Sequence, residues 1–205
     1  MKNLKLLSLI GIMSITCILS WCFFNKDKWS ENNPTEENTA TGDSDFIIED
    51  TTSSNNVIKY NNAIADYFES CHSLETTFWS TYNSYDGENT TISDIQLSLD
   101  NFINECKFSI EQLNTLWDRE GDSSLKDSVI TAIESYINYY RKLWESIQFL
   151  EKEGNLSDED AKSQARIARD LENLDAKLEQ ANNDLILTQE VFSREYWFND
   201  KLIED

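Results

Sequence analysis

Cysteines and a single histidine are the residues of this chain that most directly invite a chemical role. Cys71 and Cys106 lie in the body of the chain, whereas Cys17 and Cys22 lie in an apolar segment near the N-terminus. If two helices fold back on each other so that Cys71 faces Cys106, an oxidising compartment allows a disulfide between them. Two small buried thiols are the alternative, because facing positions on packed helices often hold their Cα atoms too far apart for a bridge.

His72 is the only histidine, and its place beside Cys71 raises the question of a metal or nucleophilic site. No second histidine and no cysteine pair at ligand spacing accompanies it, so we expect a half-exposed helix residue. Asp43-Ser44-Asp45 and the acidic run 118–122 lack the spacing of a calcium loop and are expected to cap turns. The sequence contains no P-loop, nucleophile elbow or dinucleotide-binding glycine pattern. We therefore predict no catalytic residue, no metal, no cofactor and no enzyme activity.

The net charge limits the kinds of partner that this chain can bind. Its 205 residues include 38 acidic and 17 basic side chains, which give a formal charge of −21. Such a surface repels the phosphates of nucleic acid and also discourages lying flat on anionic lipid. A well-solvated surface is the simplest meaning of so many carboxylates, and a cationic protein partner is the functional interpretation.

Residues 1–24 form an apolar segment that is predicted to bring the chain to a membrane. No charged residue occurs between positions 6 and 24, a length close to the roughly 20 residues that cross a bilayer as a helix. Leu19-Ser20-Trp21-Cys22 resembles a bacterial lipoprotein signal, which makes Cys22 the lipidation candidate, although Trp21 replaces the usual small residue. A permanent transmembrane helix and ordinary signal cleavage are the other two interpretations. Lys2 and Lys5 favour an extracytoplasmic domain.

The remaining chain divides into a linker and one domain. Residues 25–56 are rich in polar side chains, hold the only proline, and are predicted to be a disordered linker. In the domain, 57–205, the glycines Gly87, Gly121 and Gly154 separate four long pieces, each with apolar residues at helical spacing. Ser157, followed by three acidic residues, predicts the start of the last helix.

The apolar stripes of successive pieces match each other when the chain folds back at each glycine. The pairs that this register predicts include Cys71 with Cys106, Phe102 with Tyr140, Leu99 with Leu143, Tyr60 with Trp117 and, less cleanly, Tyr136 with Leu174. Short connections between such helices favour an all-α fold, an antiparallel up-down-up-down four-helix bundle with a long fourth helix. A three-helix bundle that excludes one helix, or an open helical array, is the alternative.

The fourth helix is predicted to run past the end of its partner, and this overhang carries much apolar surface. It would emerge beside the start of the first helix, at the end of the bundle nearest the membrane. One interpretation is that Phe46-Ile47-Ile48 and the end of the first helix cover it. The other is a docking surface for a protein or for the lipid interface, with the candidate residues Phe192, Tyr196, Trp197, Phe198, Leu202 and Ile203.

The opening of the first helix has a resemblance to a known family. Lys59-Tyr60-Asn61-Asn62-Ala63-Ile64 follows an apolar segment and a polar linker, and it resembles the start of the YiiG-like bacterial lipoproteins of unknown function. The likeness is confined to this short element, and Ala63 stands where that family usually has tyrosine. The resemblance implies a helical extracytoplasmic protein and supplies no activity.

These observations predict a membrane-tethered, extracytoplasmic acidic helical module. Its role would be protein binding or a structural part of the cell envelope, without catalysis; its oligomeric state does not follow from the sequence. A ligand-sensing adaptor with a polar-lined pocket inside the bundle is one alternative. A metal- or carboxylate-dependent hydrolase that works through His72 is another, and replacing His72 while measuring bound metal would separate it from the first.

Overall fold

The structure is a computed structural model that describes residues 53–117, 122–152 and 156–197, and all its regular elements are helices. The helices are α2 (Ser53–Ser73), α3 (Glu75–Asn83), α4 (Ile92–Thr115), α5 (Ser124–Ile147) and α6 (Asp158–Phe192). A 3-10 helix, η1 (Leu150–Lys152), follows α5, and a π-helix, η2 (Ser193–Trp197), follows α6. No strand occurs in the ranges that the structure describes, so the all-α prediction is confirmed there.

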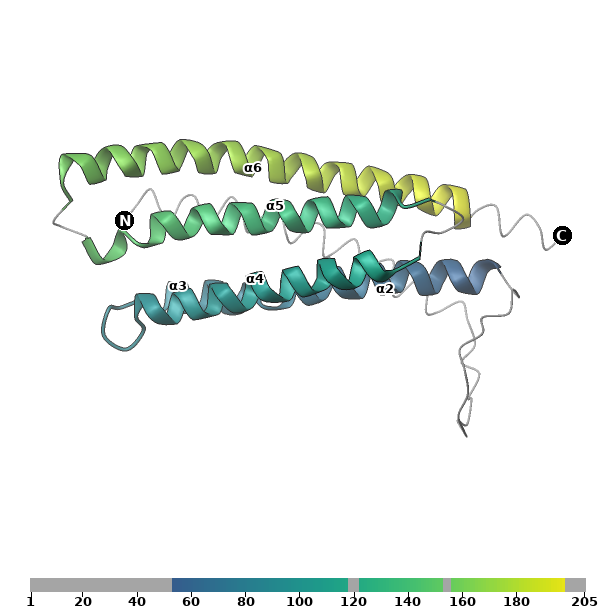
Figure 1. Cartoon of the computed structure of the whole chain (residues 1–205), viewed down its shortest axis with the longest axis horizontal. Coiled ribbons are helices and arrows are strands. Elements are labelled where there is room, and N and C mark those ends of the chain that lie inside the picture. Colours follow the sequence, from purple (N-terminus) through teal and green to yellow (C-terminus); the bar gives the residue numbers. More distant parts are fainter. Residues whose placement is uncertain (1–52, 118–121, 153–155, 198–205) are drawn as a thin grey trace, which may run out of the picture.

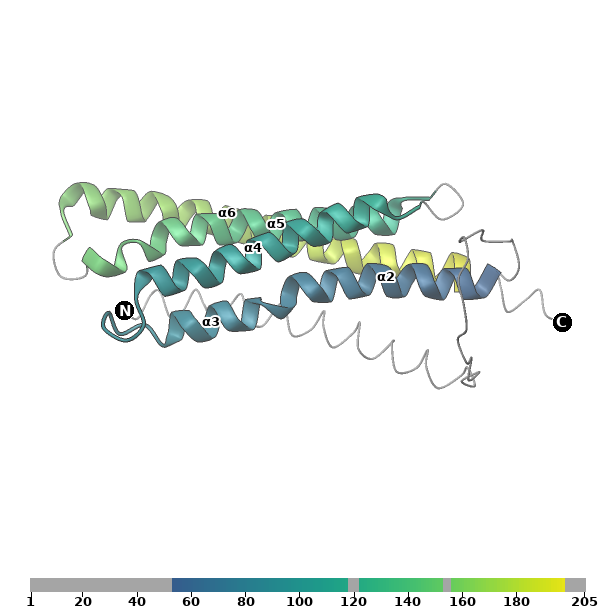
Figure 2. The same ribbon diagram turned by 60° about the horizontal axis from the view of Figure 1, so that its bottom comes forward.

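The long helices lie side by side as a helical bundle, and the chain reverses its direction between one rod and the next (Figures 1 and 2). α2 and α3 follow each other along one rod, and both pack against α4. α4 in turn packs against α5, and α5 packs against α6 along most of their length. α2 also contacts α5 and η2, which brings the first described helix beside the last described residues.

The first rod is broken at a point where the sequence predicts one continuous helix. α2 ends at Ser73, and Leu74 forms a turn before α3 begins at Glu75. The Ser73 hydroxyl donates a hydrogen bond of 2.7 Å to the carbonyl of Ser70, a local bond of the kind that competes with helical bonding. The backbone of Leu74 stays near the helical region (φ −88°, ψ −9°), so α3 continues the course of α2 (Figure 2).

The turn between α3 and α4 lies at Gly87, as the sequence predicts. Gly87 has a φ of +79°, a left-handed conformation that glycine adopts without steric cost. The carboxylate of Asp86 closes the turn by accepting hydrogen bonds from the backbone N–H groups of residues 88–90. These bonds, that of Thr90 foremost, hold the pKa of Asp86 well below its usual range. Gly121 and Gly154, predicted at the other two turns, lie outside the described residues.

α6 begins where the sequence predicts. Ser157 and Asp160 form a capping box, in which each side chain accepts a hydrogen bond of 3.1 Å from the backbone N–H of the other. Lys152 donates to the Asp160 carboxylate at 2.8 Å. The side-chain hydrogen bonds of Lys152 and Ser157 together lower the pKa of Asp160 to about 2. The cap thus joins η1 to the first turn of the longest helix.

The predicted boundary between linker and domain is late, because α2 already begins at Ser53. The first turn of a helix can leave its N–H groups to solvent, so polar residues need no apolar face to begin it. The apolar segment 1–24, residues 25–52 and residues 198–205 lie outside the described part of the chain. None of the described helices combines the length and the apolar character that a membrane crossing requires.

The apolar faces of the first three rods meet in the register that the sequence predicts. Leu99 and Leu143 are both buried, and the ring centroids of Phe102 and Tyr140 lie 4.7 Å apart. The predicted contact of Trp117 with Tyr60 also forms, at 6.1 Å between ring centroids. However, α4 ends at Thr115, so Trp117 lies beyond the helix and remains half exposed.

The predicted register between α5 and α6 is only approximate. The sequence predicts Tyr136 opposite Leu174, but the Tyr136 hydroxyl accepts a hydrogen bond of 3.2 Å from the side-chain amide of Asn182. Every Cα–Cβ bond tilts toward the N-terminus of its own helix, so long side chains on antiparallel helices meet partners displaced along the chain. Ala161, expected in the apolar stripe, is exposed, and Ile167 is buried instead.

Candidate functional site

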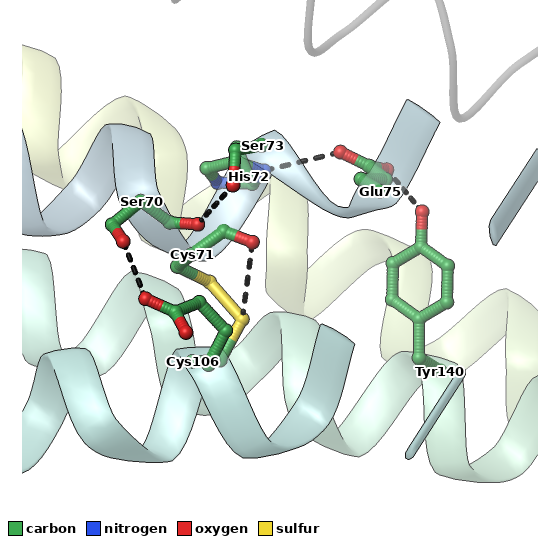
Figure 3. Close-up of a disulfide and its surroundings, with 8 residues drawn as sticks. Ser70, Cys71, His72, Ser73, Glu75, Cys106 and Tyr140 are labelled. Atoms are coloured by element: carbon green, nitrogen blue, oxygen red, sulfur yellow. Dashed lines mark hydrogen bonds and ion pairs between the residues drawn. A yellow bond between two sulfur atoms is a disulfide. The ribbon is translucent and has the colours of Figure 1, made fainter. Parts of the chain in front are cut away.

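A disulfide joins Cys71 of α2 to Cys106 of α4 (Figure 3). The S–S distance is 1.99 Å, the Cα–Cα distance is 4.2 Å, and both residues are fully buried. The Ser70 hydroxyl donates a hydrogen bond to the Glu105 carboxylate beside the bridge. α2 and α4 are therefore tied together at one level by a covalent bond and a charge-assisted hydrogen bond.

A buried carboxylate lies next to the disulfide, where the first rod breaks. Glu75 is 4% exposed, and one of its oxygens lies 3.1 Å from Nδ1 of His72. Its other oxygen accepts a hydrogen bond from the hydroxyl of Tyr140 (Figure 3). The same hydroxyl accepts a hydrogen bond of 2.9 Å from the indole nitrogen of Trp79. One carboxylate thus links α2, α3 and α5.

His72 is buried, so the prediction of a half-exposed residue is wrong. Only 5% of it is exposed, and its ring packs edge-on against Phe68 and Tyr136, with centroids 4.6 Å and 4.4 Å away. The spacing of His72 and Glu75, three residues apart, puts both on one face of the rod. That spacing is the signal from which the sequence could have indicated a buried pair. The fold gives Nδ1 of the histidine a partner in this neighbouring carboxylate.

Two polar atoms near this cluster lack a hydrogen-bond partner among the described residues. They are Nε2 of His72 and Oδ1 of Asn182. Both side chains contact Tyr136, His72 through its ring and Asn182 through its amide nitrogen. Buried polar atoms usually have partners, so the core has unused hydrogen-bonding capacity beside Tyr136.

The tyrosines of α5 are held in their neutral form. Burial, and then the negative charge of Glu75, raise the pKa of Tyr140 well above its usual value. The same two causes, in the same order, raise the pKa of Tyr136. Burial first, then the charges of Asp175 and Glu75, raise the pKa of Tyr139 to about 12. At neutral pH Tyr140 is therefore a phenol that donates a hydrogen bond to Glu75, which makes the cluster suited to holding helices together.

The predicted docking surface is partly occupied by the protein itself. Phe192 is buried, and its ring centroid lies 5.9 Å from that of Tyr60, so it belongs to the core and offers no exposed docking surface. η2, which includes Tyr196 and Trp197, contacts α2. The side chains of those two residues, and residues 198–205 with Phe198, Leu202 and Ile203, lie outside the described part.

The lipidation candidate Cys22 also lies outside the described residues. Within the described ranges, no group of three or more His, Cys, Asp or Glu side chains is placed to hold a metal ion. Asp122 belongs to the acidic run for which the sequence predicts turn capping, and its carboxylate accepts a hydrogen bond of 2.8 Å from the backbone N–H of Ser124 near the start of α5.

Comparison with known proteins gives no relative: no family model, no curated protein and no solved structure matches this chain. The resemblance to YiiG-like lipoproteins stays a prediction.

Proposed function

We propose that this chain is a membrane-tethered, extracytoplasmic helical module that binds another protein or forms a structural part of the cell envelope, without catalysis. In this proposal the domain is an antiparallel up-down-up-down four-helix bundle, with α2 and α3 as its first helix and α6 as its long fourth helix. The linker, residues 25–52 before α2, carries it away from the apolar segment 1–24. That segment stays in the membrane as a span or leaves a lipid on Cys22.

The disulfide between Cys71 and Cys106 is the observation that carries the proposal. Disulfides persist in oxidising compartments and are rare in the cytosol, where thiols are kept reduced. The positive charges of Lys2 and Lys5, before the apolar segment, favour the same side of the membrane for the domain. Two independent features, one in the core and one at the N-terminus, therefore support one location.

A binding role is supported by the division of polar groups between the core and the surface. In the core, Glu75 is engaged by His72 and Tyr140, and the tyrosine phenols remain neutral. The surface combines a large excess of carboxylates with exposed apolar side chains, among them Leu97, Phe108, Leu187 and Val191. Apolar side chains on an anionic surface suit contact with a partner that is both cationic and apolar.

A second candidate, a ligand-sensing adaptor, is favoured by the buried atoms without partners. Nε2 of His72 and Oδ1 of Asn182 would be satisfied by a small molecule that presents polar groups inside the bundle. Native mass spectrometry of the purified full chain would then show a bound small molecule, which Asn182→Ala would remove. A mass equal to that of the chain alone would rule this candidate out.

Cross-linking in the native membrane, followed by mass spectrometry, tests the main proposal. We expect the chain in the membrane fraction, cross-linked peptides from residues 53–197 joined to a protein, and an oxidised Cys71–Cys106 pair when reductant is omitted. A lipid-modified Cys22 peptide would identify the lipid anchor, and an intact N-terminus would identify the span. A chain recovered in the cytosolic fraction with reduced Cys71 and Cys106 would overturn the proposal. A Cys22→Ala variant is the control for the anchor.

A further inference from the structure

A groove of ≈ 530 Å³ lies between α3 and α4. Its lining includes Leu74 from the turn before α3, Thr77 from α3, and Leu97, Asn101, Asn104 and Glu105 from α4. It therefore offers apolar side chains, hydrogen-bonding amides and a carboxylate on one surface. This combination is typical of sites that bind a polypeptide rather than a compact apolar ligand.

The apolar part of this surface continues along α4 beyond the groove. Leu97 is 62% exposed and Phe108 is 50% exposed. Their separation is close to three helical turns, so both lie on the same face of α4, about 16 Å apart. Asn101 and Asn104 lie between them on that face. An apolar residue at each end and amides between them make a strip with the length of a short helix.

The charge of this part of the chain is unbalanced. From Tyr60 to Cys106 there is no lysine or arginine, and Lys107 is the one basic residue of α3 and α4, although acidic side chains are frequent. Of those acidic residues only Glu75 is buried, and the others are Asp66, Glu69, Asp86, Glu88, Asp94, Asp100 and Glu105. In α5, by contrast, acidic and basic residues balance. A partner that binds at α3 and α4 must therefore bring positive charge.

We propose that this groove is the docking site for a cationic amphipathic helix of a partner protein. Its apolar side chains pack on Leu97 and Phe108, and its lysine or arginine side chains pair with Asp94, Asp100 and Glu105. Helices commonly bind in this way, through residues spaced three and four apart. A second copy of this chain would present like charge, and anionic lipid would be repelled. The proposal rests on the proposed binding function and names the partner's chemistry.

Binding of a defined probe tests the groove directly. The probe is an amphipathic peptide of about 18 leucine and lysine residues, about 27 Å long as a helix, titrated against the full chain in detergent. We expect Leu97→Ser to weaken binding about fivefold, and the pair Asn101→Lys and Asn104→Lys to weaken it about tenfold. The matched controls on α6, Leu187→Ser and the pair Asn173→Lys and Gln180→Lys, should change it less than about twofold because they make the same chemical changes elsewhere.

The controls are matched in exposure as well as in chemistry, since Leu187 is 59% exposed and Asn173 and Gln180 are exposed on α6. Equal losses of peptide binding for the α4 variants and the α6 controls would show that only the overall charge attracts the peptide, and would overturn the proposal. Equal binding of a lysine peptide without leucines would overturn it too. Unchanged far-ultraviolet circular dichroism confirms that each variant is folded. If the variant with Asn101→Lys and Asn104→Lys does not fold, the comparison of Leu97→Ser with Leu187→Ser tests the proposal alone.

A photo-cross-linking residue at position 101 or 180, in the full chain in its native membrane, separates this inference from the proposed function. We expect position 101 to capture a peptide rich in lysine or arginine, and position 180 to capture none. A protein partner captured only from position 180 would refute the docking site at the groove, while the proposed binding function would still hold. Both the docking site and the proposed binding function would be refuted if neither position captured a protein and cross-linking of the whole chain also found none.

Discussion

The hydroxyl of Tyr140 is predicted to contribute more to stability than any other tyrosine hydroxyl of α5. It donates to the buried carboxylate of Glu75 and accepts from the indole of Trp79. Tyr140→Phe keeps the ring and removes both bonds. Trp79 is only half buried, so its N–H can regain water, whereas the released oxygen of Glu75 cannot. Losing one hydrogen bond to a buried charged group costs about 2 to 3 kcal/mol.

Urea unfolding of the full chain in mild detergent, followed by far-ultraviolet circular dichroism, measures this loss. At a slope of about 2 kcal/mol per molar, the midpoint should fall by about 1 to 1.5 M, with the slope unchanged. Tyr139→Phe is the matched control, because Tyr139 is the neighbouring buried residue and its hydroxyl makes no hydrogen bond within the described ranges. Its midpoint should fall by less than about 0.5 M.

Adding Trp79→Phe to Tyr140→Phe completes a double-mutant cycle. The two changes should be non-additive, because each removes the same indole-to-phenol hydrogen bond. Equal midpoints for Tyr140→Phe and Tyr139→Phe would refute the reasoning, since the carboxylate would then not depend on the hydroxyl. A lower slope for Tyr140→Phe alone would instead report a change in how much surface unfolding exposes.

Three further outcomes follow from the same structure. Replacing both Cys71 and Cys106 by alanine should lower the free energy of unfolding by about 3 to 4 kcal/mol, and urea unfolding of the wild type in reductant should show the same loss. The pKa of Asp160 is depressed to about 2, so its ionised carboxylate stabilises the fold fully above about pH 4, and this contribution to the free energy of unfolding is lost as pH falls through 2. In acid titrations Asp160→Asn should therefore lose less stability over that window than the wild type. The pKa of Tyr139 is raised to about 12, so the neutral phenol stabilises the fold fully below about pH 10, and this contribution to the free energy of unfolding is lost as pH rises through 12. Tyrosinate absorbance should show this late ionisation, and Glu75→Gln should move it to lower pH because a negative charge is removed.

The register of the first three rods could be predicted because apolar residues alone determine it. Once the chain turns near Gly87, helical spacing places Cys71 at the level of Cys106, and the structure joins them. The contact of Phe102 with Tyr140 follows from the same argument across the next turn. In each case the sequence shows both partners as members of an apolar stripe, so matching the stripes finds the pairs.

The polar interior could not be predicted in this way. Glu75 and Asn182 interrupt the apolar spacing, and each is buried because of a tyrosine on α5, far away along the chain. Whether a carboxylate is tolerated in a core depends on the partners that surround it after folding. No local pattern encodes a contact between residues 65 positions apart. The docking candidate Phe192 fails for a related reason, since it is apolar in either role and only its contact with Tyr60 shows that it is core.

The break in the first rod explains how the core tolerates the charge of Glu75. α3 begins at Glu75, so the carboxylate lies in the first turn of a helix, where the macrodipole favours negative charge. In one uninterrupted helix from α2 into α3, the same residue would lie in the middle and lose that stabilisation. The disulfide at Cys71 fixes α2 against α4 just before the break, which holds the new helix start at the level of Tyr140. The turn at Leu74 is therefore part of the structure that makes a buried carboxylate possible.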